Sequence, residues 1–238
     1  NFTLLYFGLS GRWSEVVKDQ ELRTYLLILL VAWLAMAFNL NRATDYSVAE
    51  SIRHSLFQSV SISSTGYSST NFADWPVFSQ FVLLLLMIIG ASAGSTGGGL
   101  KVLRIRIAFE LAKREVMRII QPRKVVTIRF NQNVVDEDRI WIILGMVSSW
   151  MVLVTASMLT ISFLEPNLSL TDVLSVSISL LGNTGPALGS FGPVGASSVW
   201  AELSPLSMFT STVMVVASMP KTAEPYTFSS IFFFKCTQ

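Results

Sequence analysis

Two short polar motifs of similar composition lie far apart in this 238-residue sequence. They read Ser64-Thr65-Gly66-Tyr67 and Asn183-Thr184-Gly185-Pro186. Glycine permits backbone angles that turn neighbouring carbonyl oxygens in one direction, and a set of such carbonyls can replace the hydration shell of a cation. We therefore interpret both motifs as candidate cation-binding loops. A lone Thr-Gly pair is more often an ordinary turn, so the interpretation depends on the segments around each motif.

Each motif follows an apolar segment that is too short to span a membrane, since spanning takes about 20 mostly apolar residues. These segments are Val48 to Ser64 and Val173 to Leu181. We expect each to form a short helix that enters the membrane from outside. The C-terminal end of such a helix carries partial negative charge, which favours a cation at the following Thr-Gly pair. The candidate N-caps are Asp45 or Ser47 for the first helix, and Thr171 or Asp172 for the second.

Longer apolar segments surround these short ones. Four are long enough, or nearly so, to cross a membrane: Tyr25 to Leu40, Val77 to Ala93, Ile140 to Leu164 and Leu203 to Met219. The composition agrees, because 51% of residues are hydrophobic and 13% are charged, whereas soluble domains carry about 25% charged residues. Buried core helices of a soluble protein are the alternative, but so short a chain would have little polar shell left to cover them. The sequence predicts an all-α integral membrane protein.

The basic residues indicate how the chain is oriented. Nine of the 17 Lys and Arg lie in the connection from Lys101 to Arg129, and three more precede the first apolar segment. Connections rich in Lys and Arg remain cytoplasmic, so we place the N-terminal stretch and residues 101–138 in the cytoplasm. The two Thr-Gly motifs then belong to connections that face outward. Beside a membrane helix, we attribute the basic cluster to orientation and not to nucleic-acid binding.

The order helix, re-entrant segment, helix occurs twice, with Thr65 and Thr184 separated by 119 residues. A long-period repeat of this kind is a signature of fold. We expect two tandem helix–pore loop–helix repeats of a pseudo-fourfold, cation-channel-like fold. The expected organisation is a cytoplasmic lead-in (1–23), a first repeat (24–121), a cytoplasmic connection (122–138) and a second repeat (139–238).

A third glycine-rich stretch, from Gly90 to Gly99, interrupts the second apolar segment; we call it the glycine run. Small residues there would permit close helix packing, or they would mark a break that can move. We favour the break, because consecutive glycines in a helix cost about 1 kcal/mol each relative to alanine. The candidate gate residues are Gly90, Gly94, Ser95, Thr96, Gly97, Gly98 and Gly99. A nucleotide-binding P-loop is excluded, since Leu100 separates the last glycine from Lys101.

Four stretches resemble one known family in their order: SSTGYSSTNFADWP, GASAGSTGGGLKVLRI, PRKVVTIRFNQNVV and GNTGPALG. They are similar to the C-terminal half of the Trk/Ktr/HKT superfamily of potassium transporters, most nearly its bacterial TrkH type. The resemblance extends from Asn1 to about Pro193. Members hold four helix–pore loop–helix repeats around one pore, and this chain resembles the third and fourth.

The resemblance implies a role for each motif. Ser64 to Tyr67 and Asn183 to Pro186 match two selectivity-filter loops, and potassium is implied as the transported ion bound there. The glycine run matches the intramembrane gate loop of the third repeat. The resemblance also implies a homodimer in the inner (cytoplasmic) membrane, and a cytosolic regulatory subunit that binds nucleotides. No cofactor in the chain is implied.

Two departures from the family pattern leave alternatives open. The first two repeats are absent, so we expect a fragment of a longer protein or one half of a split system. In the last helix, Thr222 stands where members usually have a pore-facing arginine, with Lys221 beside it as a possible gate charge. The alternatives to potassium uptake are a sodium-conducting relative and a truncated subunit that does not transport. Both loops keep glycine, which favours potassium over sodium.

The remaining reactive residues do not form a catalytic set. His54 is the only histidine and Cys236 the only cysteine, and we find no Ser-His-Asp or Cys-His arrangement. We expect His54 to be a polar residue near the outer end of the first short helix. The sequence therefore predicts a protein that is not an enzyme.

Overall fold

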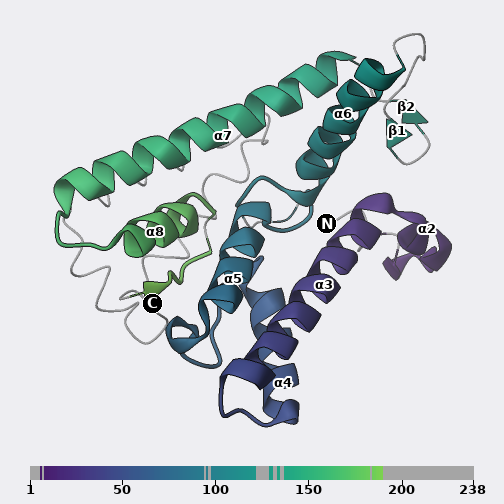
Figure 1. The fold of residues 1–238 in the computed structure, drawn as a ribbon. Helices are drawn as coiled ribbons and strands as arrows, with labels where there is room; N and C mark the ends of the chain where they lie inside the picture. The colour runs from purple at the N-terminus through teal and green to yellow at the C-terminus, as the bar shows by residue number, and fades with distance from the viewer. Residues whose placement is uncertain are drawn as a thin grey trace.

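The computed structural model describes residues 6, 8–93, 95, 98–121, 129–130, 133–134, 137–182 and 184–189. Most of the described chain is helical (Figure 1). The helices are α2 (Trp13–Lys18), α3 (Gln20–Ala43), α4 (Val48–Ile62), the 3-10 turn η1 (Phe72–Asp74), α5 (Val77–Ile89), α6 (Val102–Ile120), α7 (Glu137–Leu164) and α8 (Leu170–Gly182). Strands β1 (Arg129–Phe130) and β2 (Asn133–Val134) pair antiparallel. The predicted all-α fold is confirmed apart from this two-residue ladder.

Helices α3 and α7 are long and apolar enough to cross a membrane. They have 24 and 28 residues and contain the first and third predicted spanning segments. The most apolar 18-residue stretch of each has a mean hydropathy of 1.8 in α3 and 2.0 in α7. Within the most apolar stretch of each helix, 28% of residues are buried in α3 and 17% in α7. A core helix of a soluble protein would be mostly buried, so these apolar surfaces are suited to lipid or to further protein. The fourth predicted segment, 203–219, lies outside the described residues.

The two short helices behind the Thr-Gly motifs form as predicted, and each begins with a reciprocal cap. Ser47 caps α4, because its hydroxyl accepts from the Glu50 N–H and the Glu50 carboxylate accepts from the Ser47 N–H. Ser169 caps α8 in the same way with Asp172 as its partner. The prediction of Thr171 or Asp172 as the second N-cap is wrong. Asp172 lies three residues inside, where an acidic side chain reaches back to the cap.

Helix α5 ends where the glycine run begins, as expected for a break in the helix. The predicted segment runs to Ala93, but the helix stops at Ile89, and Gly90 adopts a φ of +68°. The chain then folds back on α5: the N–H groups of Leu100 and Lys101 donate to the Ile88 and Ile89 carbonyls, each at 3.0 Å. Lys101 has a φ of +69°, rare for a residue other than glycine, and α6 starts immediately after it. The glycine run is therefore a break between two helices.

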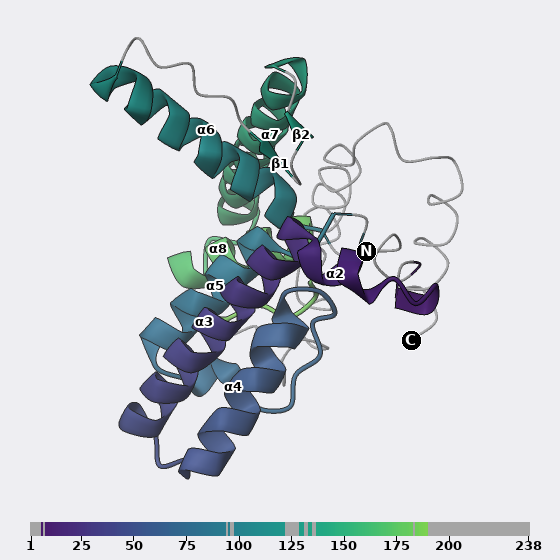
Figure 2. The same ribbon diagram turned by 90° about the vertical axis from the view of Figure 1, so that its right-hand side faces the viewer.

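One apolar core joins the two halves of the chain. Met36 and Leu40 of α3 and Leu83 of α5 are fully buried in a cluster that also includes Trp150 of α7 and Ile178 of α8. Helix α3 packs along α4, and α5 contacts α8 (Figure 2). Because side chains from both Thr-Gly-bearing halves share this core, the positions of the two motifs are fixed relative to each other.

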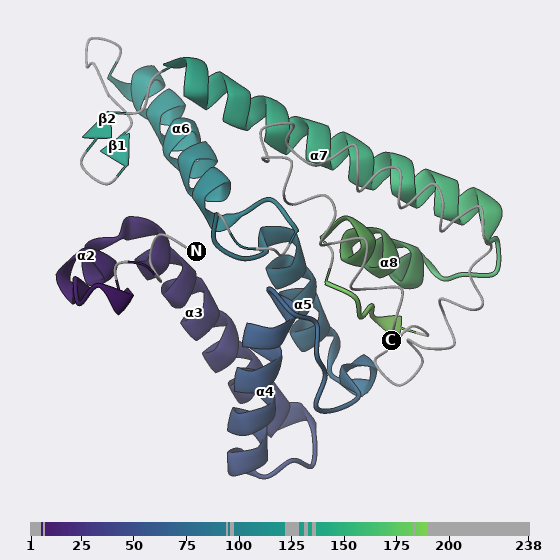
Figure 3. The same ribbon diagram turned by 180° about the vertical axis from the view of Figure 1, so that it is seen from behind.

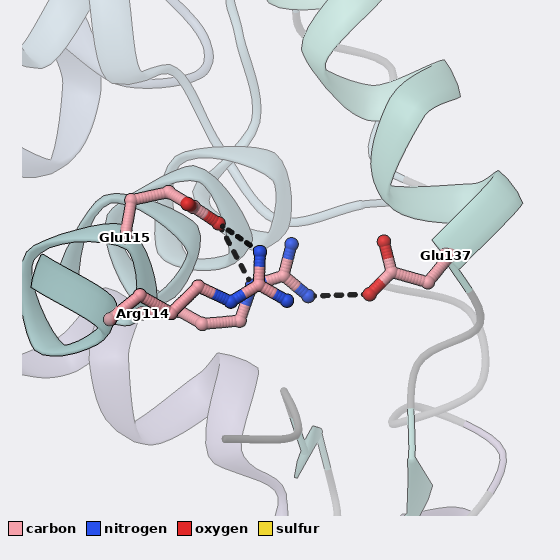
Figure 4. A network of polar contacts seen from close by, with 4 residues as sticks. Arg114, Glu115 and Glu137 are labelled. Carbon is pink, nitrogen blue, oxygen red and sulfur yellow. Dashed lines mark hydrogen bonds and ion pairs between the residues drawn. The ribbon is translucent and has the colours of Figure 1, made fainter. Parts of the chain in front are cut away.

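An ion-pair network links α6 to the start of α7 (Figure 4). The Arg114 side chain is 6% exposed, and its guanidinium contacts Glu137 Oε1 at 2.7 Å and Glu115 Oε1 at 3.2 Å. Arg118 contacts the same Glu115 oxygen at 3.1 Å. The far end of α6 thus lies beside the first turn of α7, with β1 and β2 at the same end of the molecule (Figure 3). The network ties the two halves together at a second place, away from the core.

Candidate functional site

The two Thr-Gly motifs come into direct contact. A Cβ added at Gly66 would overlap the carbonyl oxygen of Thr184 and crowd Pro186. Gly66 has a φ of +74° and Gly185 a φ of +102°, both in the region that side chains disfavour. The first motif can therefore lie against the second only because Gly66 lacks a side chain. The structure brings together Gly66, Thr184 and Pro186, which the sequence placed in one site.

A serine in the last turns of each short helix anchors the threonine that follows. In α4, the Ser61 carbonyl accepts the N–H groups of Thr65 and Gly66, and its hydroxyl donates to the Tyr67 carbonyl at 2.5 Å. In α8, the Ser179 carbonyl accepts the Thr184 N–H at 3.1 Å. The Thr184 hydroxyl also contacts the Ser179 hydroxyl at 3.2 Å. The two motifs thus share a local device for turning the chain out of the helix.

The contacts around the second motif extend to its far side. The Ser175 hydroxyl, fully buried in α8, lies 3.2 Å from the Leu188 carbonyl, to which it donates. Asp172 is 4% exposed, and its carboxylate lies against Gly189, where a Cβ would overlap it. These two contacts hold the chain that leaves the motif alongside the helix that leads into it. Thr184 is 4% exposed, whereas Thr65 is exposed and Gly185 has open space where a Cβ would be.

The glycine run packs directly beneath the second motif. The Gly98 N–H donates to the Gly182 carbonyl, the last residue of α8, at 2.9 Å. A Cβ at Gly98 would overlap that same oxygen. The C-terminal carbonyls of a helix have no partner within the helix, so this bond satisfies one of them. Lys101 also stabilises the run, since its ammonium donates to the Ser95 carbonyl at 3.0 Å.

The N-terminal end of α4 carries a carboxylate, Glu50, whose pKa is shifted. The Ser47 N–H and hydroxyl donate to the Glu50 side chain at 2.9 and 2.8 Å. These hydrogen bonds stabilise the ionised form and lower the pKa of Glu50 below its ordinary value of 4.5. The cap therefore stabilises the ionised form of Glu50 in the folded chain.

Some predicted site residues cannot be placed. Asn183, Gly94, Thr96, Gly97 and Lys221 lie outside the described residues. Other residues at the site were missed by the sequence analysis, namely Ser61, Ser179, Ser175 and Glu21. Ser61 and Ser179 carry a weak signal, since they lie four and five residues before the motif threonines Thr65 and Thr184. Glu21 carries none, because its partner Ala93 is distant in the chain.

Comparison with known proteins gives consistent matches. A family model for TrkH, described as a cation transport protein, matches residues 20–216. The chain is 34% identical over 212 residues to the Trk system potassium uptake protein TrkH of Vibrio parahaemolyticus, covering 84% of this chain and 43% of that protein. It is 31% identical over 199 residues to the protein of the same name in Escherichia coli strain K12, covering 79% of this chain and 39% of that protein.

A solved structure matches as well. The crystal structure of the potassium transporter TrkH from Vibrio parahaemolyticus superposes with a TM-score of 0.74 at 31% identity. The match covers 90% of this chain and 47% of that one. The chain therefore spans less than half the length of the relatives it matches.

Proposed function

Because this chain belongs to the TrkH family of cation transport proteins, we propose that it supplies half of a potassium-uptake pore. In this proposal the two Thr-Gly motifs are filter loops, and the first two repeats of a longer protein complete the ring. Carbonyl oxygens of the four loops would replace the water around potassium as it passes. The relatives named as potassium uptake proteins support this choice of ion.

The contact between Gly66 and Thr184 carries the proposal. It joins two motifs from separate repeats, and in each the Gly after the threonine has a φ that turns the chain away from helical geometry. Each motif also follows the C-terminal end of a capped helix, α4 or α8, whose partial negative charge favours a cation. Non-helical backbone at this depth is tolerated only where it is packed in protein or lines a wet cavity.

We propose further that the glycine run is the gate of this pore. The Gly98–Gly182 hydrogen bond supports this proposal, because it holds Gly98 against the C-terminal end of α8, the helix that leads into the second motif. The break between α5 and α6 is a second support, because a continuous helix could not bring Gly98 to that position.

The test is rubidium uptake into vesicles that contain the complete four-repeat chain, with and without excess sodium. We expect uptake that sodium does not inhibit, and we expect Gly185→Asp and Gly66→Asp to abolish it. Gly185→Asp is the sharper variant, because a Cβ there meets no atom within 4 Å, whereas one at Gly66 overlaps the Thr184 carbonyl. Gly145→Ala is the matched control, since Gly145 in α7 also has open space around it. Uptake that survives both aspartate variants would contradict the filter assignment.

Measuring sodium uptake in the same vesicles separates the two alternatives. Uptake of sodium in place of rubidium would assign the chain to sodium conduction. No uptake of either ion by folded protein would assign it to a subunit that does not transport. The homodimer, the nucleotide-binding regulatory subunit and the inner-membrane location remain predictions that follow from the family resemblance. The cytoplasmic placement of residues 1–23 and 101–138 remains a prediction from the distribution of Lys and Arg.

A further inference from the structure

The first turn of α3 carries a buried carboxylate that binds the glycine run. Glu21 is 4% exposed, and its Oε1 accepts a hydrogen bond from the Ala93 N–H. Burying a carboxylate is unfavourable unless it is hydrogen-bonded, and the bond from the Ala93 N–H meets this requirement. Ala93 belongs to the part of the run that leaves α5. The run is therefore fastened to a helix that is distant from it in the chain.

One helical turn further along α3, a second side chain holds the base of the first Thr-Gly motif. The Tyr25 hydroxyl lies 2.9 Å from the Ser63 hydroxyl. Ser63 caps the C-terminal end of α4, is 2% exposed, and directly precedes the motif. Residues four apart lie on the same face of a helix, about 6 Å apart along its axis. One short stretch of α3 therefore contacts both segments: Glu21 binds the glycine run, and Tyr25 binds the base of the first motif.

The same stretch is also tied to α6. The Arg106 guanidinium donates to the Gln20 carbonyl at 3.1 Å and to the Thr24 hydroxyl. Arg106 lies five residues beyond Lys101, which closes the run against Ser95. Both ends of the run are therefore connected to the start of α3: the leading end through Glu21, and the trailing end through α6 and Arg106.

We infer that Glu21 is a gate-positioning residue, which holds the glycine run under the second Thr-Gly motif while Tyr25 on the same helix face holds the first motif. This inference rests on the proposed pore function. Removing the carboxylate frees the Ala93 N–H and releases the leading end of the run. Since a hydrogen bond to a charged group contributes about a tenfold bias to an equilibrium, loss of this one favours the open run on the order of tenfold.

The experiment measures rubidium and sodium flux through the complete four-repeat chain in liposomes. Glu21→Ala is expected to raise basal rubidium flux several-fold while leaving the rubidium-to-sodium ratio unchanged. Glu21→Gln is expected to raise it less, because an amide oxygen still accepts from Ala93. Tyr25→Phe is expected to lower the rubidium-to-sodium ratio instead. Glu110→Ala, which removes a carboxylate from α6, is the matched control and is expected to behave as the parent.

The parent chain distinguishes a failure of the proposed function from a failure of this inference. If the parent passes neither ion, the proposed function fails. If the parent conducts rubidium and Glu21→Ala conducts the same amount or less, the inference fails. Hydrogen exchange gives a second measurement in case Glu21→Ala does not fold: the Ala93 amide should exchange several-fold faster in Glu21→Gln than in the parent. Equal exchange in the two proteins would also overturn the inference.

Discussion

Gly66 and Thr184 touch through bare backbone: the α-carbon of the first faces the carbonyl oxygen of the second, and no side chain separates them. The contact joins the two halves of the chain at the motifs that the family resemblance assigns to ion selection. The two glycines of the site therefore differ in the space around them. A Cβ at Gly66 would overlap the Thr184 carbonyl, whereas a Cβ at Gly185 would meet no atom within 4 Å.

We predict that Gly66→Ala is more damaging than Gly185→Ala. Both changes place alanine at positive φ, which costs about 1–2 kcal/mol. Gly66→Ala must also displace the Thr184 carbonyl or Pro186, so its total cost is higher and its rubidium uptake lower. Thermal unfolding of the detergent-solubilised protein measures stability, with Gly145→Ala as the control. Equal melting temperatures for the two site variants would contradict the close contact.

Ser61→Ala is expected to loosen the first motif. The change leaves the Tyr67 carbonyl without its donor, and a lost hydrogen bond of this kind costs about 1 kcal/mol. We expect a lower rubidium-to-sodium ratio with little change in protein yield. Ser148→Ala is the control, because its hydroxyl bonds only within α7 at an exposed position. A parent-like ion ratio in Ser61→Ala would show that this anchor does not shape the motif.

The two residues of the Arg114–Glu137 pair, which joins α6 to α7, are expected to contribute unequally to stability. Arg114 is buried along its stem and Glu137 is 62% exposed, so Arg114→Ala loses packing as well as charge. We expect Arg114→Ala to lower the melting temperature more than Glu137→Gln does. A double-mutant cycle should give a coupling of about 1 kcal/mol or less that falls with added salt. A coupling that salt does not change would show that the pair acts through packing alone.

Acid is expected to open the N-terminal end of α4. The pKa of Glu50 is lower in the folded chain than its ordinary value, so the contribution of its ionised form is complete above that value and is lost as pH falls through the folded pKa. Amides in the first turn of α4 should therefore exchange faster, relative to the intrinsic rate, as pH falls from about 5 to about 3. Glu50→Gln should remove this dependence. A dependence that persists in Glu50→Gln would assign it to another group.

The elements of the site could be predicted from sequence where the signal is local. The apolar stretch gave Asp45 or Ser47 as the cap of α4, and the structure selects Ser47. The Thr-Gly pairs mark where both short helices end. The second cap was missed because Ser169 is followed by an aspartate where glutamate or glutamine is the usual partner. The end of α5 is likewise a local signal, because the helix stops at Ile89, directly before the glycine run that was expected to break it.

The contacts between elements could not be predicted in this way. Neither the Glu21–Ala93 hydrogen bond nor the packing of Gly66 on Thr184 leaves a trace in spacing, since each joins residues that are far apart in the chain. Glu21 looks like an ordinary acidic residue in the first turn of a helix, where it would favour the helix dipole. Only the fold shows that its carboxylate is buried against another segment.

The way the glycine run folds back on α5 sets a condition on its movement. The N–H groups of Leu100, Lys101 and Val102 occupy the carbonyls of Ile88, Ile89 and Ala91. If the run and the residues that follow it move away from α5, those three carbonyls lose their donors, and each carbonyl left unmet in a membrane interior costs several kcal/mol. Water or a permeating cation is the only available replacement. Displacement of the run and wetting of the space beside α5 are therefore a single event, and a dry displaced state is not a stable intermediate.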